Sequence, residues 1–398
     1  MTTEQSLVGD VVELDVGPVA HGGHCVARLE GQVVFVRHAI PGEQIRAKIT
    51  EQTAKYLRAD AVEILRPSPH RVEPPCPFAG PGRCGGCDFQ HVAIGEQRRL
   101  KAQVVTDTLR RIGKISYDVT MEAPAGDTGL GWRSRMRYAV ESGTPGMYAH
   151  RSHELIRIDR CLIAHPDSPA VLDRTWPGAS AVQTVVSSAG ETAVVTEQDG
   201  EPDSAAGSRR VHEVVRDRRF RVQATGFWQV HPAAAPTLVD AVLAGLEPRP
   251  GETALDLYSG VGLFAAFLAE AGCAVLAVES DEEAVRNARR NLHDLPAVTL
   301  ESGRVGRVLT SAARQGLESV DLAVLDPPRT GAGPDVVRAV AALTPRRVAY
   351  VACDPAALAR DLRVFLDSGY ELAGIRAFDL FGMTHHIECV AVLTRIDG

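Results

Sequence analysis

Cys353 is the residue of this sequence best placed to act as a nucleophile. The apolar run RRVAYVAC ends on this cysteine, and Asp354 and Pro355 follow it, which predicts a strand and then a helix. A thiol attacks as its thiolate, so its pKa must lie below the usual value of about 8.5 or a base must be near. The predicted helix N-terminus favours the thiolate. A cysteine that only packs is the alternative interpretation.

A second group of residues has the spacing of a nucleotide site. The strand TALDLYS leads into Gly260 and Gly262 and then into an apolar helix, and Glu279 ends the next predicted strand. Small residues let the backbone approach a nucleotide, and such a carboxylate can accept hydrogen bonds from ribose hydroxyls. The pattern suits S-adenosylmethionine and NAD alike, and a plain tight turn is the alternative.

Asp326 adds a carboxylate at the same predicted edge. It ends the strand DLAVLD, and Pro327 and Pro328 follow it with fixed φ. Ligands of open α/β sheets lie beyond the carboxyl ends of the strands, so a rigid carboxylate is expected beside the cofactor. This resembles the Asp/Asn-Pro-Pro element of methyltransferases that act on bases. A proline-rich turn is the alternative.

Four cysteines are candidates for metal ligation: Cys76, Cys84, Cys87 and Cys161. Three of them lie in VEPPCPFAGPGRCGGCDFQH, a segment with almost no apolar periodicity, so a hydrophobic core cannot fix its shape. Four thiolates suit tetrahedral zinc and an iron–sulfur cluster equally, and the spacing does not decide between them. The remaining cysteines, Cys25, Cys273 and Cys389, have the surroundings of packing residues.

These residues are distributed over three predicted parts. Residues 1–67 alternate polar and apolar positions as in a small all-β barrel, residues 68–225 are β-rich, and residues 226–398 alternate strands and helices. The last pattern predicts a doubly wound, mostly parallel sheet. A helical period over 94–114 predicts an amphipathic helix with Leu100, Val104, Val105, Leu109 and Ile112 on one face. The polar stretch 196–210 is predicted to be a mobile hairpin loop.

Charge and hydropathy limit the class of protein. The 398 residues carry a formal charge of −7, and no apolar run approaches the length of a membrane span. The polar start MTTEQSLVGD predicts a cytoplasmic protein. Basic residues are concentrated locally, and RNA contacts would depend on two such groups: Arg98, Arg99, Lys101, Arg110 and Arg111, and then Arg133, Arg135 and Arg137. Solvated surface charge is the alternative for each group.

Together these motifs resemble the RNA uracil-5-methyltransferase family over nearly the whole chain. GFWQVHP is similar to the Phe-x-Gln-Val-Asn element of that family, YVACDPAALARDL to its nucleophile motif and THHIE to its Thr-x-His-x-Glu element. The resemblance implies an N-terminal, OB-like TRAM domain that binds RNA, a central domain with a 4Fe-4S cluster and a Rossmann-like catalytic domain. This sequence departs from the common pattern of the family at His231, Asp354 and Gly382.

The resemblance also implies a role for each site residue. Cys353 is the implied nucleophile and Glu388 the implied general base. The implied contacts of S-adenosylmethionine are Gln229, Tyr258, Glu279 and Asp326, beside Gly260 and Gly262. The four cysteines Cys76, Cys84, Cys87 and Cys161 are the implied cluster ligands. The helix at 94–114 is expected to pack on the catalytic domain.

The expected reaction is methylation of uridine carbon 5 in structured RNA by a monomeric enzyme. Uracil C5 is too weak a nucleophile alone, but a thiolate that adds at C6 makes it an enolate. A general base must then remove the C5 proton. The uracil must also be flipped out of the RNA stack to reach these groups. Ribosomal RNA is favoured over transfer RNA. The alternatives are a methyltransferase of adenine amines, a catalytically silent RNA-binding factor and an NAD-linked oxidoreductase.

Overall fold

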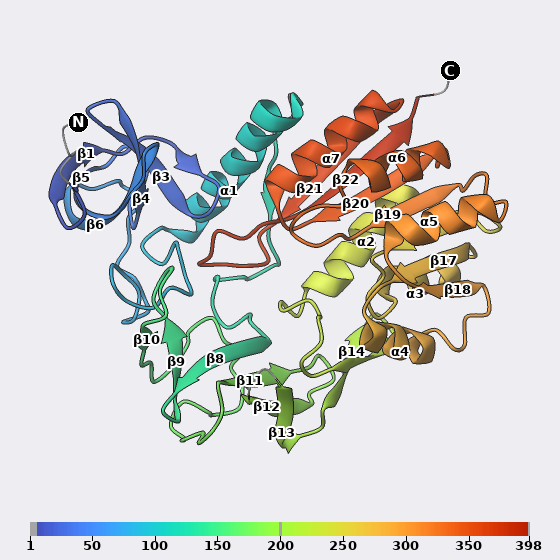
Figure 1. The fold of residues 1–398 in the computed structure, drawn as a ribbon, viewed down its shortest axis with the longest axis horizontal. Helices are drawn as coiled ribbons and strands as arrows, with labels where there is room; N and C mark the ends of the chain where they lie inside the picture. Colours follow the sequence, from blue (N-terminus) through green and yellow to red (C-terminus); the bar gives the residue numbers. More distant parts are fainter. Residues whose placement is uncertain (1–5, 199–200, 397–398) are drawn as a thin grey trace.

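The computed structural model describes residues 6–198 and 201–396, which form three β-containing parts (Figure 1). The first is the predicted N-terminal barrel, a six-stranded sheet in the order β1-β5-β6-β4-β3-β2. Its strands are β1 (Val11–Asp15), β2 (Val19–Ala20), β3 (His24–Leu29), β4 (Gln32–Arg37), β5 (Gln44–Gln52) and β6 (Tyr56–Arg66). In β5, Ile45, Ala47 and Ile49 are buried and the residues between them are exposed, because successive side chains point to opposite faces.

The central part is a second six-stranded sheet in the order β10-β9-β8-β11-β12-β13. Its strands are β8 (Arg135–Glu141), β9 (Thr144–Tyr148), β10 (Leu155–Ile156), β11 (Ala181–Val186), β12 (Thr192–Gln198) and β13 (Glu201–Gly207). The predicted hairpin over 196–210 is confirmed, but strands β12 and β13 take up most of the segment that was expected to be a loop. Backbone hydrogen bonds sustain this hairpin although its sequence is polar. Residues 199 and 200, between the strands, lie outside the described residues.

The C-terminal part is an eight-stranded sheet in the order β18-β17-β16-β19-β20-β22-β21-β7. The first five strands are parallel, as predicted, and β22 and β21 pair antiparallel beyond them. The strands are β16 (Thr253–Leu257), β17 (Ala274–Glu279), β18 (Val298–Ser302), β19 (Leu322–Leu325), β20 (Arg347–Ala352), β21 (Tyr370–Phe378), β22 (Glu388–Arg395) and β7 (Met121–Glu122).

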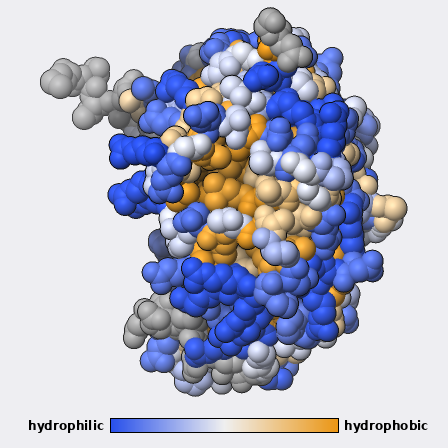
Figure 2. Space-filling view, turned by 90° about the vertical axis from the view of Figure 1, so that its right-hand side faces the viewer, coloured by the Kyte–Doolittle hydropathy of each residue, from blue (hydrophilic) through white to orange (hydrophobic). Residues whose placement is uncertain are grey.

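Helices cover both faces of this sheet, which makes it doubly wound. Leu255 and Leu257 of β16 pack with the helices on one face of the sheet, whereas Ala254 packs with the helices on the other face. The helices are α2 (Ala234–Leu246), α3 (Leu263–Glu270), α4 (Glu282–Asn291), α5 (Val305–Arg314), α6 (Pro334–Ala342) and α7 (Pro355–Asp367). Figure 2 shows the side that carries β18 and α5, where hydrophobic residues gather at the centre of the face and hydrophilic residues surround them. No described helix is long and apolar enough to cross a membrane.

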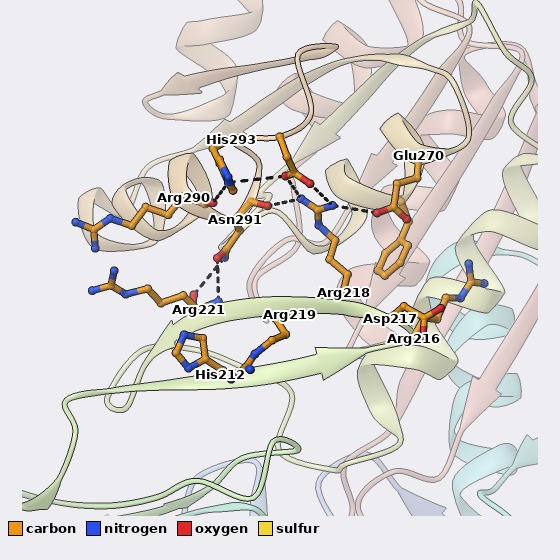
Figure 3. Close-up of a pocket in the computed structure, with 12 residues that line it drawn as sticks. His212, Arg216, Asp217, Arg218, Arg219, Arg221, Glu270, Arg290, Asn291 and His293 are labelled. Atoms are coloured by element: carbon orange, nitrogen blue, oxygen red, sulfur yellow. Dashed lines mark hydrogen bonds and ion pairs between the residues drawn. The ribbon is translucent and has the colours of Figure 1, made fainter.

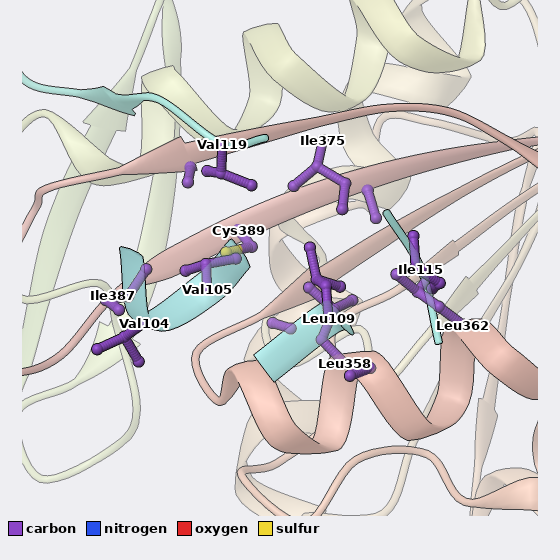
Figure 4. Close-up of a cluster of buried hydrophobic side chains, with 14 of the residues drawn as sticks. Val104, Val105, Leu109, Ile115, Val119, Leu358, Leu362, Ile375, Ile387 and Cys389 are labelled. Atoms are coloured by element: carbon purple, nitrogen blue, oxygen red, sulfur yellow. The ribbon is translucent and has the colours of Figure 1, made fainter. Parts of the chain in front are cut away.

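A helix from the N-terminal half belongs to the core of the C-terminal sheet. This is α1 (Ile94–Thr108), continued by the π-helical turn η1 (Leu109–Gly113). Figure 4 shows Val105 and Leu109 packed among Leu358, Ile375 and Cys389 of the α/β part. Ile112, predicted on the same buried face, is 42% exposed, because the π turn changes the helical period there.

The first predicted basic group mostly forms internal ion pairs. Lys101 is 1% exposed, and its Nζ lies 2.6 Å from the Asp379 carboxylate. Arg98 binds the same carboxylate from the other side at 3.2 Å. Arg99 and Arg110 pair with acidic residues of their own helix. The expectation that these residues form one RNA-contacting group is therefore wrong for Arg98 and Lys101.

The second basic group also has internal partners. Arg135 is mostly covered, with 10% of its side chain exposed, and is bound to Glu213 at 3.1 Å, whereas Arg137 is bound to Glu197 at 2.6 Å. Arg135 also donates to three backbone carbonyls between residues 223 and 226. Its guanidinium therefore joins β8 to β14 (Arg210–Val215) and to the chain after β15 (Arg218–Gln223). That hairpin packs against α4, where the Arg221 backbone N–H donates to the Asn291 side chain at 2.8 Å.

Candidate active site

A glycine turn connects β16 to α3. Tyr258, Gly260 and Gly262 all have left-handed backbone conformations, with φ of 64°, 56° and 91°. A Cβ on Gly260 would meet no atom within 4 Å, so the space beside it is open for a ligand. A Cβ on Gly262 would lie 2.7 Å from Leu292, so packing and backbone both require glycine there. The turn thus combines one open position with one closely packed position.

Glu279 is held across this turn at the end of β17. Its Oε2 accepts a hydrogen bond from the Gly260 backbone N–H at 2.9 Å, and its Oε1 accepts one from the Asp281 N–H at 2.7 Å. The Ser280 N–H also donates to Oε1, so three backbone donors orient the carboxylate beside the open position. The free lone pair of Oε2 can accept a hydrogen bond from a ribose hydroxyl.

Asp256 is a site residue that the sequence reasoning passed over. It is 0% exposed, and its Oδ2 accepts a hydrogen bond from the Ala265 N–H at 2.7 Å, near the start of α3. Its Oδ1 is buried without a partner among the described residues. Burial raises the pKa of Asp256 to about 7. The available signal was an acidic residue within the otherwise apolar strand TALDL.

Cys353, Asp326 and Glu388 lie together because their strands are neighbours in the sheet. Asp326 follows β19, Cys353 follows β20 and Glu388 begins β22, and Ala352 pairs with Cys389 in the ladder between the last two. Glu388 is 4% exposed, and no described residue makes a hydrogen bond to its carboxyl group. Burial first, and then the Asp326 carboxylate, raises the pKa of Glu388 well above its usual value.

The expectation that the helix N-terminus favours the Cys353 thiolate is wrong for the protein alone. Burial, together with the Glu388 and Asp326 carboxyl groups, raises the pKa of Cys353 to about 11. The helix does begin where predicted, but the Asp354 carboxylate caps it by accepting from the Ala357 N–H at 2.7 Å. Arg329 is the cation that opposes the shift.

The four predicted cluster cysteines surround one small cavity. Cys76, Cys84, Cys87 and Cys161 line a space of about 30 Å³ whose other walls include Phe78, Met136, Met147 and Ile158. No three His, Cys, Asp or Glu side chains of residues 6–198 and 201–396 are arranged to hold a single metal ion. Burial raises the pKa of Cys84, Cys87 and Cys161. Metal ligation would offset this cost by stabilising the thiolates.

Comparison with known proteins decides the family. A model described as TRAM domain matches residues 5–62, and one described as tRNA (Uracil-5-)-methyltransferase matches residues 208–396. A protein named as an RNA methyltransferase from Streptomyces coelicolor is 48% identical over 432 residues, which cover 98% of this chain and 93% of that relative. The chain belongs to the RNA uracil-5-methyltransferase family.

Two further relatives extend this comparison. A Bifidobacterium longum protein named as an RNA methyltransferase is 37% identical, over 96% of both chains. The solved structure of the Pyrococcus abyssi tRNA (uracil-54, C5)-methyltransferase with S-adenosyl-L-homocysteine has a TM-score of 0.73 and 23% identity. That match covers 96% of this chain and 99% of the other. It shows that the methyltransferase has the same overall fold.

The TRAM barrel of this methyltransferase reaches the active site through a loop after β2. His21 of this loop lies 3.2 Å from the carboxylate of Asp354, the residue that follows Cys353. A second chain of contacts runs from Arg37 to Asp88 at 3.1 Å and from Asp88 to His385 at 2.6 Å. Asp354, which departs from the family pattern, has two partners in this methyltransferase: the His21 side chain and the Ala357 backbone N–H.

The chain around Gln229 carries an exposed aromatic ring. Gln229 is 8% exposed and makes no side-chain hydrogen bond with the described residues, so its amide remains available to a ligand. Phe227, two residues earlier, is 78% exposed, and the sequence reasoning gave it no role. The Val230 carbonyl accepts hydrogen bonds from Ser134, which tie this segment to the central domain of the methyltransferase. An exposed ring is suited to stacking on a nucleic-acid base.

We expect Asp326→Asn to make the Cys353 thiol reactive at lower pH. The substitution removes a negative charge that raises the pKa of both Cys353 and Glu388. The measurement is the rate of Cys353 alkylation by iodoacetamide between about pH 7 and 11, read by mass spectrometry of its peptide. Asp335→Asn, on the exposed start of α6, is the matched control. An unchanged alkylation profile in Asp326→Asn would contradict the assigned electrostatic coupling.

Proposed function

We propose that the protein methylates carbon 5 of a uridine in structured RNA with S-adenosylmethionine as donor. The observation that supports this most directly is the enclosure of Cys353, Asp326 and Glu388 at one sheet edge. An amine methyltransferase needs no thiol at that place, whereas attack on uracil C6 does.

The glycine turn and the strand ends are the proposed donor site. Glu279 would accept a hydrogen bond from a ribose hydroxyl, and the open space at Gly260 would admit the nucleoside. Tyr258, Gly262, Gln229 and Asp326 would complete its walls. Bound S-adenosylmethionine supplies an electrophilic methyl group on sulfonium and leaves as S-adenosylhomocysteine.

The chemical steps follow from the two reactive side chains. Cys353 first loses its thiol proton to solvent, and the thiolate sulfur then forms a bond to C6 of the flipped uracil while the electrons move to C5 and O4 as an enolate. C5 then forms the bond to the methyl carbon as the methyl–sulfonium bond breaks. Glu388 takes the C5 proton, the double bond re-forms, and the C6–sulfur bond breaks to return the thiolate. Glu388 can act in this way only when it is ionised.

The proposed RNA is either ribosomal or transfer RNA. The sequence favours ribosomal RNA, whereas the Pyrococcus relative is a transfer RNA enzyme by name. The decisive experiment incubates the protein with labelled S-adenosylmethionine and unmodified transcripts of both RNA classes, followed by nucleoside analysis. We expect label in 5-methyluridine. Label in methylated adenine, or transfer to neither RNA, would overturn the proposal.

We also propose that Cys76, Cys84, Cys87 and Cys161 hold a 4Fe-4S cluster. The shared cavity and the four soft donors fit this group, and a position in the central domain suits a structural role. We expect protein purified without oxygen to be brown and to contain about four iron atoms per chain. Cys161→Ser should lose this iron, whereas Cys273→Ser, a buried control, should keep it. Stoichiometric zinc in colourless protein would contradict the cluster.

A further inference from the structure

A basic groove lies between the hairpin β14–β15 and the ends of α3 and α4. Its volume is about 690 Å³, and Arg218, Arg221, Arg290, His212 and Phe267 are among the residues that line it (Figure 3). Neither the candidate active site nor the cysteine cavity shares these residues. The groove therefore needs an explanation of its own.

Some of the arginines here are structural. Arg218 is bound to Glu270 at 3.0 Å and to both carboxylate oxygens of Asp294, so it joins the hairpin to α3 and to the chain after α4. Arg216 is bound to Asp240 and lies 5.3 Å from the centre of the Phe267 ring. These side chains fix the shape of the groove, and their charges are already neutralised by the paired carboxylates.

Two other arginines of the groove, Arg221 and Arg290, have no such partner, and neither has the neighbouring Arg210. Their guanidinium groups form no ion pair with any carboxylate among residues 6–198 and 201–396. Figure 3 shows the Arg221 and Arg290 side chains extending toward the same side, away from the paired Arg218. Partial burial, and then Arg210 and Arg290, lower the pKa of Arg221, so both neighbouring cations repel the Arg221 charge.

Such a group is suited to a polyanion, because phosphates would neutralise the repelling cations and release their own counterions. Several unpaired cations in one place favour a chain of phosphates over a single one. We propose that this groove binds the phosphate backbone of the RNA substrate, as a second contact distinct from the TRAM barrel. This inference rests on the proposed function.

The groove is connected to the donor site through one side chain. The Asn291 amide oxygen accepts from the Arg221 backbone N–H, and its amide nitrogen donates to the Val261 carbonyl at 3.0 Å, within the glycine turn. The next residue, Leu292, packs against Gly262. In Figure 1 the hairpin and α4 lie across the molecule from the TRAM barrel. RNA that touched both surfaces would thus span the molecule.

The test replaces Arg221 and Arg290 by alanine together. Neither side chain has a described partner, and the backbone hydrogen bond of Arg221 to Asn291 remains, so the fold should persist. The matched control is Arg307→Ala with Arg314→Ala, which removes two exposed and unpaired arginines from α5. The measurement is filter binding of unmodified ribosomal and transfer RNA transcripts over a range of NaCl concentrations. S-adenosylmethionine affinity and single-turnover methyl transfer at saturating RNA are measured in parallel.

We expect the groove variant to bind RNA about 10-fold more weakly at ~0.1 M salt, with the slope of log affinity against log salt reduced by about 1 to 2. Donor affinity and the saturated rate should stay within about twofold, and the control should match the wild type. Unchanged RNA affinity and slope would overturn the inference, as would an equal loss in the control or a parallel loss of donor affinity. Failure of the proposed function appears separately, as wild-type protein that binds RNA but forms no 5-methyluridine.

Discussion

Cys353→Ala is expected to reduce methyl transfer by about 10⁴-fold or more, the scale of losing a covalent nucleophile. Without the sulfur, C5 of the uracil never gains enolate character. The measurement is single-turnover transfer of labelled methyl to RNA, together with formation of a denaturation-resistant adduct on RNA containing 5-fluorouridine. Fluorine at C5 cannot leave as a proton, so the wild-type protein should stay attached and the variant should not.

Cys273→Ala is the matched control for this experiment. Cys273 is buried at the start of β17, and its thiol makes only a long contact to the Arg249 carbonyl at 3.8 Å. Its loss should therefore leave transfer within a fewfold of the wild type. If Cys353→Ala kept its activity, the methyl acceptor would need no covalent activation, and an adenine amine would become the better hypothesis.

Glu388→Gln should produce the opposite phenotype, a protein that starts the reaction and cannot finish it. The amide occupies the same buried volume but cannot take the C5 proton, so the methylated adduct should accumulate on ordinary uridine. Turnover should fall by about 10² to 10⁴-fold, the usual contribution of a general base. The removal of a negative charge near Cys353 should not slow adduct formation.

The adduct is measured as RNA that comigrates with protein on a denaturing gel. Glu371→Gln, an exposed position on the neighbouring strand β21, is the control and should behave as wild type. The double variant Cys353→Ala with Glu388→Gln should form no adduct, which assigns the trapped bond to the cysteine. Normal turnover by Glu388→Gln would show that another group removes the proton.

The positions of the reactive residues were predictable because each directly precedes or follows an apolar strand. Cys353, Asp326 and Glu279 end such runs, and parallel strands bring their carboxyl ends to one edge. The protonation of Cys353 was not predictable. It depends on Glu388 and on burial, and both arise only when β20 and β22 pair.

Contacts between distant segments also escaped the sequence reasoning. His21 contacts Asp354 although most of the sequence separates them, and neither residue has a local pattern that indicates the other. The prediction of RNA contacts from local clusters of arginine and lysine failed for the same reason, because ion-pair partners such as Glu213 lie on other elements. The basic groove, in turn, is formed by residues of the β14–β15 hairpin, α3 and α4, which are separate in sequence.

The buried pair of Lys101 and Asp379 constrains the order in which the chain can fold during its synthesis. The ribosome makes Lys101 278 residues before Asp379. At about 5 to 20 residues per second, this delay is on the order of tens of seconds. During that time α1 has neither its charge partner nor the strands that cover Val105 and Leu109. The nascent protein should therefore expose the apolar face of an amphipathic helix until translation is nearly complete.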